Sequence, residues 1–196
     1  MTRIRHQRKI SPIILIKAEG NNQTETKYFS NFSSRKVRIK FATGNSTNPN
    51  GMLNDLINYM RKEDISSKYG DKIYLLIDTD LNSKRINEIR NIKNKCLEYG
   101  IELIVSSPTF EIWFILHFTN SNILFTSSMD VKKALRKYIK DYKENMNIYD
   151  KIVLETDKAI KNAKYNENNR LDEDVLDINP YTNIYKIIEV IKLLNK

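Results

Sequence analysis

The chain has 196 residues, 40% of them hydrophobic, and a formal net charge of +9 at pH 7. This hydrophobic fraction excludes disorder throughout, and the low counts of glycine (5) and proline (4) disfavour a turn-rich all-β protein. A lone cysteine, Cys96, excludes an intramolecular disulfide and a cysteine-rich zinc site, and it favours a reducing compartment. The longest apolar run, at 112–116, is far shorter than the ~18 residues of a membrane span. We therefore expect a cytoplasmic protein without membrane segments.

The positive charge is concentrated in two segments. The first opens the chain with Arg3, Arg5, Arg8 and Lys9. The second contains six basic residues, Lys132, Lys133, Arg136, Lys137, Lys140 and Lys143. Basic surfaces attract polyphosphates because binding releases condensed counterions. A solvated, lysine-rich surface explains the same charge equally well, so charge supports a nucleic-acid partner without establishing one.

Apolar runs rich in β-branched residues predict strands at 13–16, 74–77 and 101–105. Such runs are typical of strands that are buried on both faces, as in a parallel sheet covered by helices. A further strand is expected at 36–41. Apolar residues at three-four spacing predict helices at 52–60 and 86–97, the second ending before Gly100.

No strand is predicted beyond Phe118. Helices are expected at 110–118, 131–142, 152–163 and 183–194, with a polar loop at 165–177. The predicted fold is α/β, with a mostly parallel sheet flanked by helices. Its α/β core covers residues 1–118, and a helical C-terminal part, residues 119–196, packs on that core.

Acidic residues follow three of the predicted strands, where α/β proteins place their active sites. Glu19 follows the first strand with Glu25 shortly after it, Asp78 and Asp80 follow the strand at 74–77, and Glu111 follows the strand at 101–105. Asp78 and Asp80 are two residues apart in extended chain and point to the same side. Glu19, on a neighbouring strand, is expected to face them.

Carboxylates gathered in this way predict a magnesium site. Magnesium prefers oxygen ligands and is usually held by one or two carboxylates, water and substrate phosphate. One or two ions there could activate a water and stabilise the leaving oxygen of a phosphodiester. The alternatives are plainer: loops are polar, Glu25 suits the first turn of a helix, and Glu111 could cap or pair locally. We interpret His117 and Cys96 as packing residues rather than ligands.

The Glu-Gly pair and the later Asp-x-Asp motif resemble the signature of Toprim domains, which topoisomerases, bacterial primases and OLD nucleases share. More closely, the chain resembles the RloB family over nearly its whole length. The motifs of this resemblance are the basic leader, Glu19-Gly20, Thr24-Glu25, Tyr28-Phe29, Asp78-Thr79-Asp80, 106–113, 116–118 and 179–182. Ser107 and Thr109 stand where the family usually has asparagine and cysteine. Neither departure removes a carboxylate.

The resemblance implies a Toprim nuclease of prokaryotic anti-phage defence and abortive infection, cleaving DNA or RNA, tRNA included. It implies one or two Mg²⁺ or Mn²⁺ ions as cofactor, held by Glu19, Glu25, Asp78 and Asp80, with Glu111 completing a second site. It also implies an ABC-type ATPase as partner. Lys140 is our choice for a basic residue that contacts the scissile phosphate, beside the catalytic acids Glu19, Asp78, Asp80 and Glu111.

Two other functions fit parts of the pattern. A haloacid-dehalogenase-type phosphohydrolase also begins with strand-Asp-x-Asp, but it needs a small residue where Asn82 stands and leaves Glu19 unexplained. A non-catalytic Toprim-like module could sense nucleic acid or a nucleotide and regulate a partner ATPase. The basic leader suits such a module equally well, although an anion binder gains nothing from clustered carboxylates without a metal.

The predicted C-terminal helix is apolar around much of its circumference. Its apolar residues are Ile184, Tyr185, Ile187, Ile188, Val190, Ile191, Leu193 and Leu194. One stripe can pack on the core, and the remainder would then be exposed on a monomer, where an ATPase partner or a second copy of the chain could cover it. The alternative is that the helix is fully sandwiched.

Overall fold

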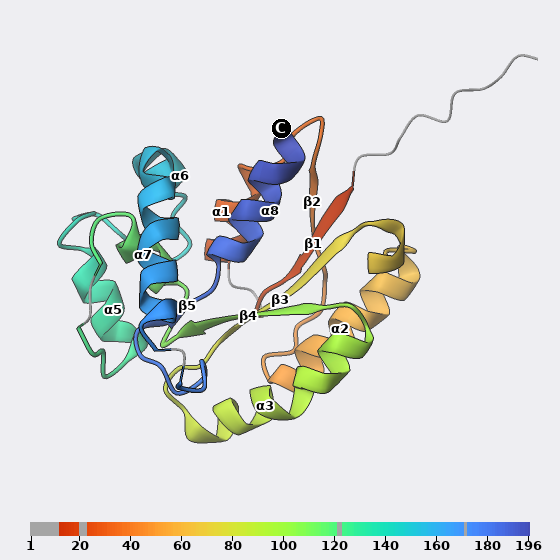
Figure 1. Cartoon of the computed structure of the whole chain (residues 1–196), viewed down its shortest axis with the longest axis horizontal. Helices are drawn as coiled ribbons and strands as arrows, with labels where there is room; N and C mark the ends of the chain where they lie inside the picture. Colours follow the sequence, from red (N-terminus) through yellow and green to blue (C-terminus); the bar gives the residue numbers. More distant parts are fainter. Residues whose placement is uncertain (1–11, 20–22, 121–122, 171) are drawn as a thin grey trace, which may run out of the picture.

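A five-stranded sheet forms the centre of the computed structural model, which describes residues 12–19, 23–120, 123–170 and 172–196 (Figure 1). The strand order is β2-β1-β3-β4-β5. The first four strands are parallel: β1 (Ile13–Lys17), β2 (Arg38–Phe41), β3 (Lys72–Asp78) and β4 (Glu102–Ser107). The short strand β5 (Tyr181–Thr182) pairs antiparallel to β4. The basic leader and Gly20 lie outside the described residues.

Helices connect the strands and cover the sheet. The first three are α1 (Gln23–Ser30), α2 (Pro49–Lys62) and α3 (Ser83–Glu98), with a 3-10 turn η1 (Ser67–Tyr69) before β3. After β4 come α4 (Glu111–Leu116), α5 (Ser128–Leu135), α6 (Tyr149–Ile152), η2 (Val153–Glu155), α7 (Thr156–Asn168) and α8 (Tyr185–Asn195). None of these described helices has the length and apolarity that crossing a membrane requires.

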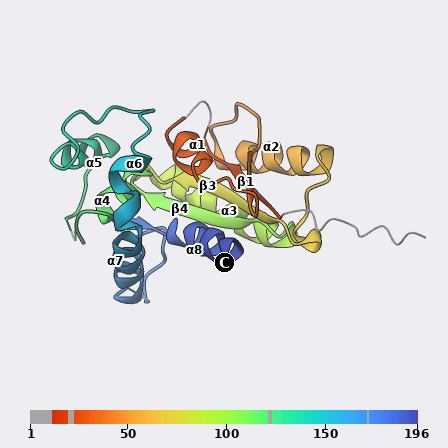
Figure 2. The same ribbon diagram turned by 90° about the horizontal axis from the view of Figure 1, so that it is seen from above.

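The sheet separates two hydrophobic clusters because successive strand side chains point to opposite faces. On β3, Tyr74 and Leu76 join the cluster of α1, α4, α7 and α8, whereas Ile73, Leu75 and Ile77 join that of α2 and α3. All five side chains are buried. Figure 1 shows this layering, with α1 and α8 on one side of the sheet and α2 and α3 on the other, and Figure 2 shows the same ribbon from above. The continuous apolar strands of the sequence are thus explained by burial on both faces.

The predicted strands and the parallel sheet are confirmed, and the differences lie in the C-terminal part. The prediction that no strand follows Phe118 was wrong, because β5 pairs with β4 and adds a fifth strand to the sheet. A strand of two residues is too short to show a period of two, so the sequence carries no signal for it. The helix predicted at 131–142 begins earlier, at Ser128, and ends at Leu135 in a series of turns. Helix α7 continues to Asn168, into the segment predicted as a loop.

Helix α8 packs one face on the sheet and leaves the opposite side at the surface. Ile184, Ile187, Ile188 and Ile191 are at most 2% exposed and belong to the cluster on that side of the sheet. Leu193, which is 67% exposed, is the exception. The buried side chain of Asn183, just before the helix, accepts a hydrogen bond from the Val105 amide (2.8 Å) and so fixes the start of α8 to β4. The sheet-facing side of the C-terminal helix is therefore packed, whereas Val190 and Leu194 are partly buried and Leu193 is exposed.

His117 is a buried residue at the end of α4, packed edge-on against the Trp113 ring at 4.9 Å. Its Nδ1 lies 2.9 Å from the carbonyl oxygen of Trp113, and its Nε2 has no hydrogen-bond partner in the described part of the chain. Burial lowers the pKa of His117 to about 4, because the charged imidazolium would lose its hydration. The ring is therefore neutral at pH 7 and acts as a packing residue.

This pKa shift predicts a pH dependence of stability. The unfolded chain binds a proton at His117 below pH ~6.5, whereas the folded chain does so only near pH 4. We expect His117 to reduce the free energy of unfolding by about 3 kcal/mol between pH 7 and pH 4. In His117→Gln that part of the pH dependence should disappear. Urea denaturation at several pH values measures both proteins, and parallel curves would contradict the prediction.

Candidate metal and substrate site

The acidic residues predicted from the sequence gather at the carboxyl edge of the sheet. Asp78 is the last residue of β3 and pairs in register with Ser106 of β4. Glu19 lies two residues beyond the Lys17–Leu75 pair, which brings it level with the end of β3. Glu111 is the first residue of α4, and Glu25 lies in the first turn of α1. Parallel neighbouring strands end at the same edge, so residues far apart in sequence meet there.

Three of these carboxylates, from different elements, form the acid cluster: Glu25, Asp78 and Glu111. Glu25 and Glu111 are buried and Asp78 is half-buried. Burial, followed by the charge of Asp78, raises the pKa of Glu25. Burial, followed by the charge of Glu111, raises the pKa of Asp78 to about 8. Poor solvation and close spacing therefore both oppose ionisation of these carboxyl groups in the absence of a cation.

Hydroxyl groups hold two members of the acid cluster. The Thr109 hydroxyl lies 3.0 Å from Asp78 Oδ2 and 2.8 Å from Glu111 Oε2, so one oxygen bridges both carboxylates. The Tyr142 hydroxyl donates to Glu111 Oε1 at 2.8 Å. A hydroxyl is a stronger donor than the thiol that the resemblance described above leads us to expect at this position, and it suits contact with both carboxylates. Tyr142 was not among the site residues predicted from the sequence.

The loop after β3 is strained in a way that orients Asp80. Asp80 and Leu81 have φ angles of 51° and 55°, in the left-handed region that side-chain-bearing residues seldom adopt. The Asp80 amide donates to the carbonyl oxygen of Pro108 at 2.9 Å, and the Thr79 hydroxyl donates to Ser107 Oγ at 2.9 Å. The loops after β3 and β4 are thus tied together. Such strain persists when the surroundings impose it, commonly at functional sites.

Arg85 is a site residue that the sequence reasoning missed. Its guanidinium donates to Glu19 Oε2 (2.6 Å), to the carbonyl oxygen of Asp78 (2.6 Å) and to that of Thr47 (2.9 Å). Asp80 Oδ2 lies 3.8 Å from its Nε. Partial burial raises the pKa of Glu19 despite this cation. One signal was present: Arg85 lies in the first turn of α3, where the helix dipole disfavours a cation, so a tertiary partner was to be expected.

Two basic residues occupy different positions relative to the acid cluster. Lys132 of α5 is partly buried, interacts electrostatically with Glu111 and Asp78, and pairs with Glu144. Lys140, predicted to contact the scissile phosphate, is exposed in the turns after α5, two residues before Tyr142. The second basic segment therefore continues from the acid cluster onto the surface.

The donor chemistry of the site suits a hard divalent cation. Across the described ranges, no three acidic, histidine or cysteine side chains are arranged so that they could hold a metal ion together. Magnesium needs only one or two protein carboxylates when water and substrate phosphate complete its shell. Asp78 and Glu111, bridged through Thr109, offer such a pair, whereas Glu19 is engaged by Arg85. Metal binding by these acids stays a prediction.

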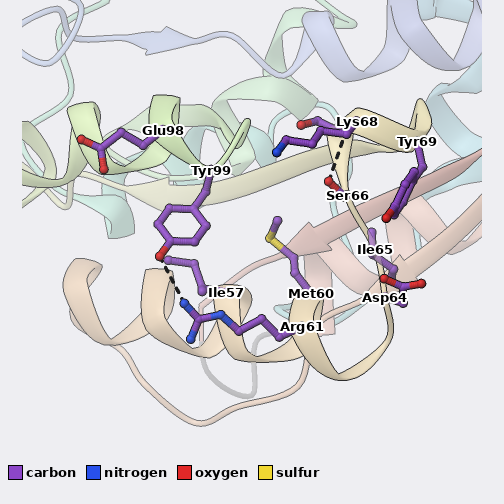
Figure 3. A pocket seen from close by; sticks show the side chains of 11 residues that line it. Ile57, Met60, Arg61, Asp64, Ile65, Ser66, Lys68, Tyr69, Glu98 and Tyr99 are labelled. Carbon is purple, nitrogen blue, oxygen red and sulfur yellow. Dashed lines mark hydrogen bonds between the residues drawn. The ribbon is translucent and has the colours of Figure 1, made fainter.

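A surface pocket of about 450 Å³ lies at the opposite edge of the sheet (Figure 3). The end of α2, η1 and the end of α3 line it, next to the amino ends of β3 and β4. The Arg61 guanidinium donates to the Tyr99 hydroxyl across it at 3.2 Å. Its two acids, Asp64 and Glu98, lie at opposite ends. This pocket and the clustered acids therefore lie at opposite edges of the sheet. The acids make the carboxyl edge the better candidate for the functional site.

The contacts of Arg85 generate a prediction for stability. Arg85→Met keeps the aliphatic stem but leaves Glu19 and two carbonyl oxygens without their donor. We expect the free energy of unfolding to fall by about 2 kcal/mol. Arg90→Met is the matched control on the same helix, because Arg90 pairs with Asp174 and Asp177 at the surface and its loss should matter much less. Chemical denaturation measures the free energy of unfolding of both variants. Equally small decreases in the two variants would refute the stabilising role of Arg85.

Comparison with known proteins agrees with the resemblance of the motifs. The family described as RloB-like protein matches residues 14–191, which is most of the chain. No curated protein matches the chain, and no solved structure does so either. The matched range includes β1, β3 and β4 with all the acids of the carboxyl edge. On this evidence the chain belongs to the RloB-like family.

Proposed function

We propose that this protein is a metal-dependent nuclease that hydrolyses phosphodiester bonds of nucleic acid at the carboxyl edge of its sheet. The observation that carries the proposal is the acid cluster, Glu25, Asp78 and Glu111, gathered from α1, β3 and α4 beside a basic surface. Membership of the RloB-like family supports it. We further propose Mg²⁺ or Mn²⁺ as the cofactor.

The energetics of the acid cluster favour a cation. Placing carboxylates together away from water is unfavourable unless positive charge or hydrogen bonds compensate. The nearby cations are engaged elsewhere: Arg85 holds Glu19 and two carbonyl oxygens, and Lys132 is paired with Glu144. A divalent ion would reduce the remaining repulsion between Asp78 and Glu111.

The roles of the residues follow from their contacts. Asp78 and Glu111 would hold the ion, with water and substrate phosphate completing its shell. A bound divalent ion supplies a water of lowered pKa and neutralises charge on the phosphate. The Thr109 hydroxyl keeps Asp78 and Glu111 at a fixed separation. Glu19, oriented by Arg85, is our choice for transferring a proton at the rim of the site.

The substrate is assigned from the charge beside the acid cluster. Lys133, Arg136, Lys137 and Lys140 are exposed on α5 and the turns that follow it. A polyanion whose backbone follows this segment passes next to Tyr142, whose hydroxyl contacts Glu111. Phosphate contacts of this kind bind nucleic acid irrespective of sequence. Both DNA and RNA, tRNA included, satisfy them.

A second candidate function is a non-catalytic module that binds nucleic acid or a nucleotide and regulates an ATPase. The observation in its favour is that Glu19, central to the Toprim-like site, is already paired with Arg85 at 2.6 Å. The role in anti-phage defence and the ABC-type ATPase partner rest on the resemblance to the RloB family. We include them in the proposal on that ground.

The proposed metal site is tested with Asp78→Asn. The variant keeps a hydrogen-bond acceptor for Thr109 but removes the ionisable carboxyl group that would bind the metal, so we expect loss of Mn²⁺ binding without a lower melting temperature. Calorimetric titration measures binding, and plasmid or total tRNA with Mg²⁺ or Mn²⁺ measures cleavage. Glu63→Gln is the control, because Glu63 pairs with Lys40 at the surface. Unchanged Mn²⁺ binding in Asp78→Asn would refute the metal site. Binding without any cleavage would favour the non-catalytic module.

The proposed path of the backbone is tested by salt dependence. Lys137→Ala and Lys140→Ala should each flatten the slope of log affinity against log salt by about one unit per lost phosphate contact. Lys68→Ala, an exposed lysine at the opposite edge, should leave the slope unchanged. Affinities for a labelled oligonucleotide at four salt concentrations give the slopes. Identical slopes in all variants would mean that this segment is merely solvated.

A further inference from the structure

Tyr138 presents an aromatic ring to solvent beside the candidate site. It lies in the turns after α5 and is 45% exposed. Its ring is stacked on that of Phe118, with centroids 4.9 Å apart and planes inclined by 7°. Phe118 follows α4, which begins with Glu111. The pair therefore joins the two segments that carry the acid cluster and the basic surface.

The stacked geometry sets this pair apart within the described part of the chain. The ring pairs around Tyr28, Phe110 and Phe114 in the core meet edge-on or tilted, as aromatic packing commonly does. Phe118 packs against one face of the Tyr138 ring, and we assign the 45% exposure of the residue to the opposite face and the hydroxyl edge. The ring beneath limits tilting of Tyr138. The Tyr138 ring is thus a flat apolar surface that is exposed to water and is not part of the hydrophobic core.

The surroundings of this ring are cationic. Arg136, Lys137 and Lys140 lie within two positions of Tyr138 in the sequence, and all three are exposed. Arg136 Nε donates a hydrogen bond to the carbonyl oxygen of Tyr142 at 3.2 Å. Within the described ranges, no ion pair joins Lys137 or Lys140 to a carboxylate. A flat ring face beside cations that form no ion pair suits one kind of ligand, a nucleic-acid base attached to its phosphate backbone.

We propose that Tyr138 is a stacking platform for an unpaired base, so that the protein binds single-stranded or looped nucleic acid in preference to continuous duplex. Within a duplex both faces of each base are covered by neighbouring bases, and no face is free for the ring. An unpaired base can stack on the open face of Tyr138 while its phosphates contact the adjacent lysines. This inference rests on the proposed function for its ligand, nucleic acid, but not for catalysis.

Binding without catalysis tests the platform. Fluorescence anisotropy in EDTA gives affinities for a labelled single-stranded DNA, a single-stranded RNA of the same sequence, and the blunt DNA duplex. For Tyr138→Ala we expect about tenfold weaker binding of single strands and unchanged binding of duplex. Tyr138→Phe keeps the ring and should bind like the wild type. Tyr138→Leu keeps an apolar contact with Phe118 without a ring and should match Tyr138→Ala, which separates stacking from a local packing defect.

Tyr69→Ala is the matched control, because Tyr69 is 72% exposed in η1 at the opposite edge (Figure 3). A strand carrying 2-aminopurine supplies a direct signature, since stacking on Tyr138 changes its fluorescence and the alanine variant should abolish that change. Equal losses for duplex and single strand, no loss in Tyr138→Ala, or no binding of either single strand by the wild type would each overturn the proposal. If stacking is observed but the protein cleaves nothing, only the proposed nuclease activity is refuted. The affinities for single-stranded DNA and single-stranded RNA show which of the two the protein prefers.

Discussion

Repulsion between carboxylates at the carboxyl edge of the sheet is the constraint around which the local structure is organised. Asp78 and Glu111 come from different elements, yet one hydroxyl, that of Thr109, contacts both. Tyr142 adds a second donor to Glu111, and Arg85 ties Glu19 to the ends of two loops. These contacts hold like charges together at a cost that solvation would otherwise avoid. The metal ion that we propose would offset this cost.

The same edge connects the acids to the surface that we assign to nucleic acid. Helix α4 begins at Glu111 and leads to Phe118, and the turns after α5 carry Tyr138 before reaching Tyr142. The candidate ligand Glu111, the proposed phosphate contacts and the proposed stacking surface therefore lie on two segments that pack against each other through Phe118 and Tyr138. This arrangement explains why a short family motif, Pro-x-Phe-Glu-x-Trp, contains both a ligand candidate and core aromatics.

Parts of the site that depend on strand order could be predicted, and parts that depend on side-chain direction could not. The acids after β1, β3 and β4 were identified because buried parallel strands have a clear apolar pattern and end at a common edge. Arg85 was missed because its partner Glu19 is 66 residues away in the sequence. Its partners also lie at or beyond the ends of elements, where no periodicity indicates which side chains meet. Tyr142 was missed because its segment was predicted as continuous helix, whereas the chain turns after Leu135.

The sequence by itself determined the sheet, most of the helices and the set of acids, since these follow from local periodicity and from residue type. The tertiary structure decided which charges meet. It paired Glu19 with Arg85, bridged Asp78 and Glu111 through Thr109, and buried α8 against the sheet. Period and propensity describe one element at a time, whereas the packing of α8 and the position of β5 depend on surfaces from distant parts of the chain. Pairwise contacts at the carboxyl edge arise only when the strands are brought side by side, because their energies fall steeply with distance.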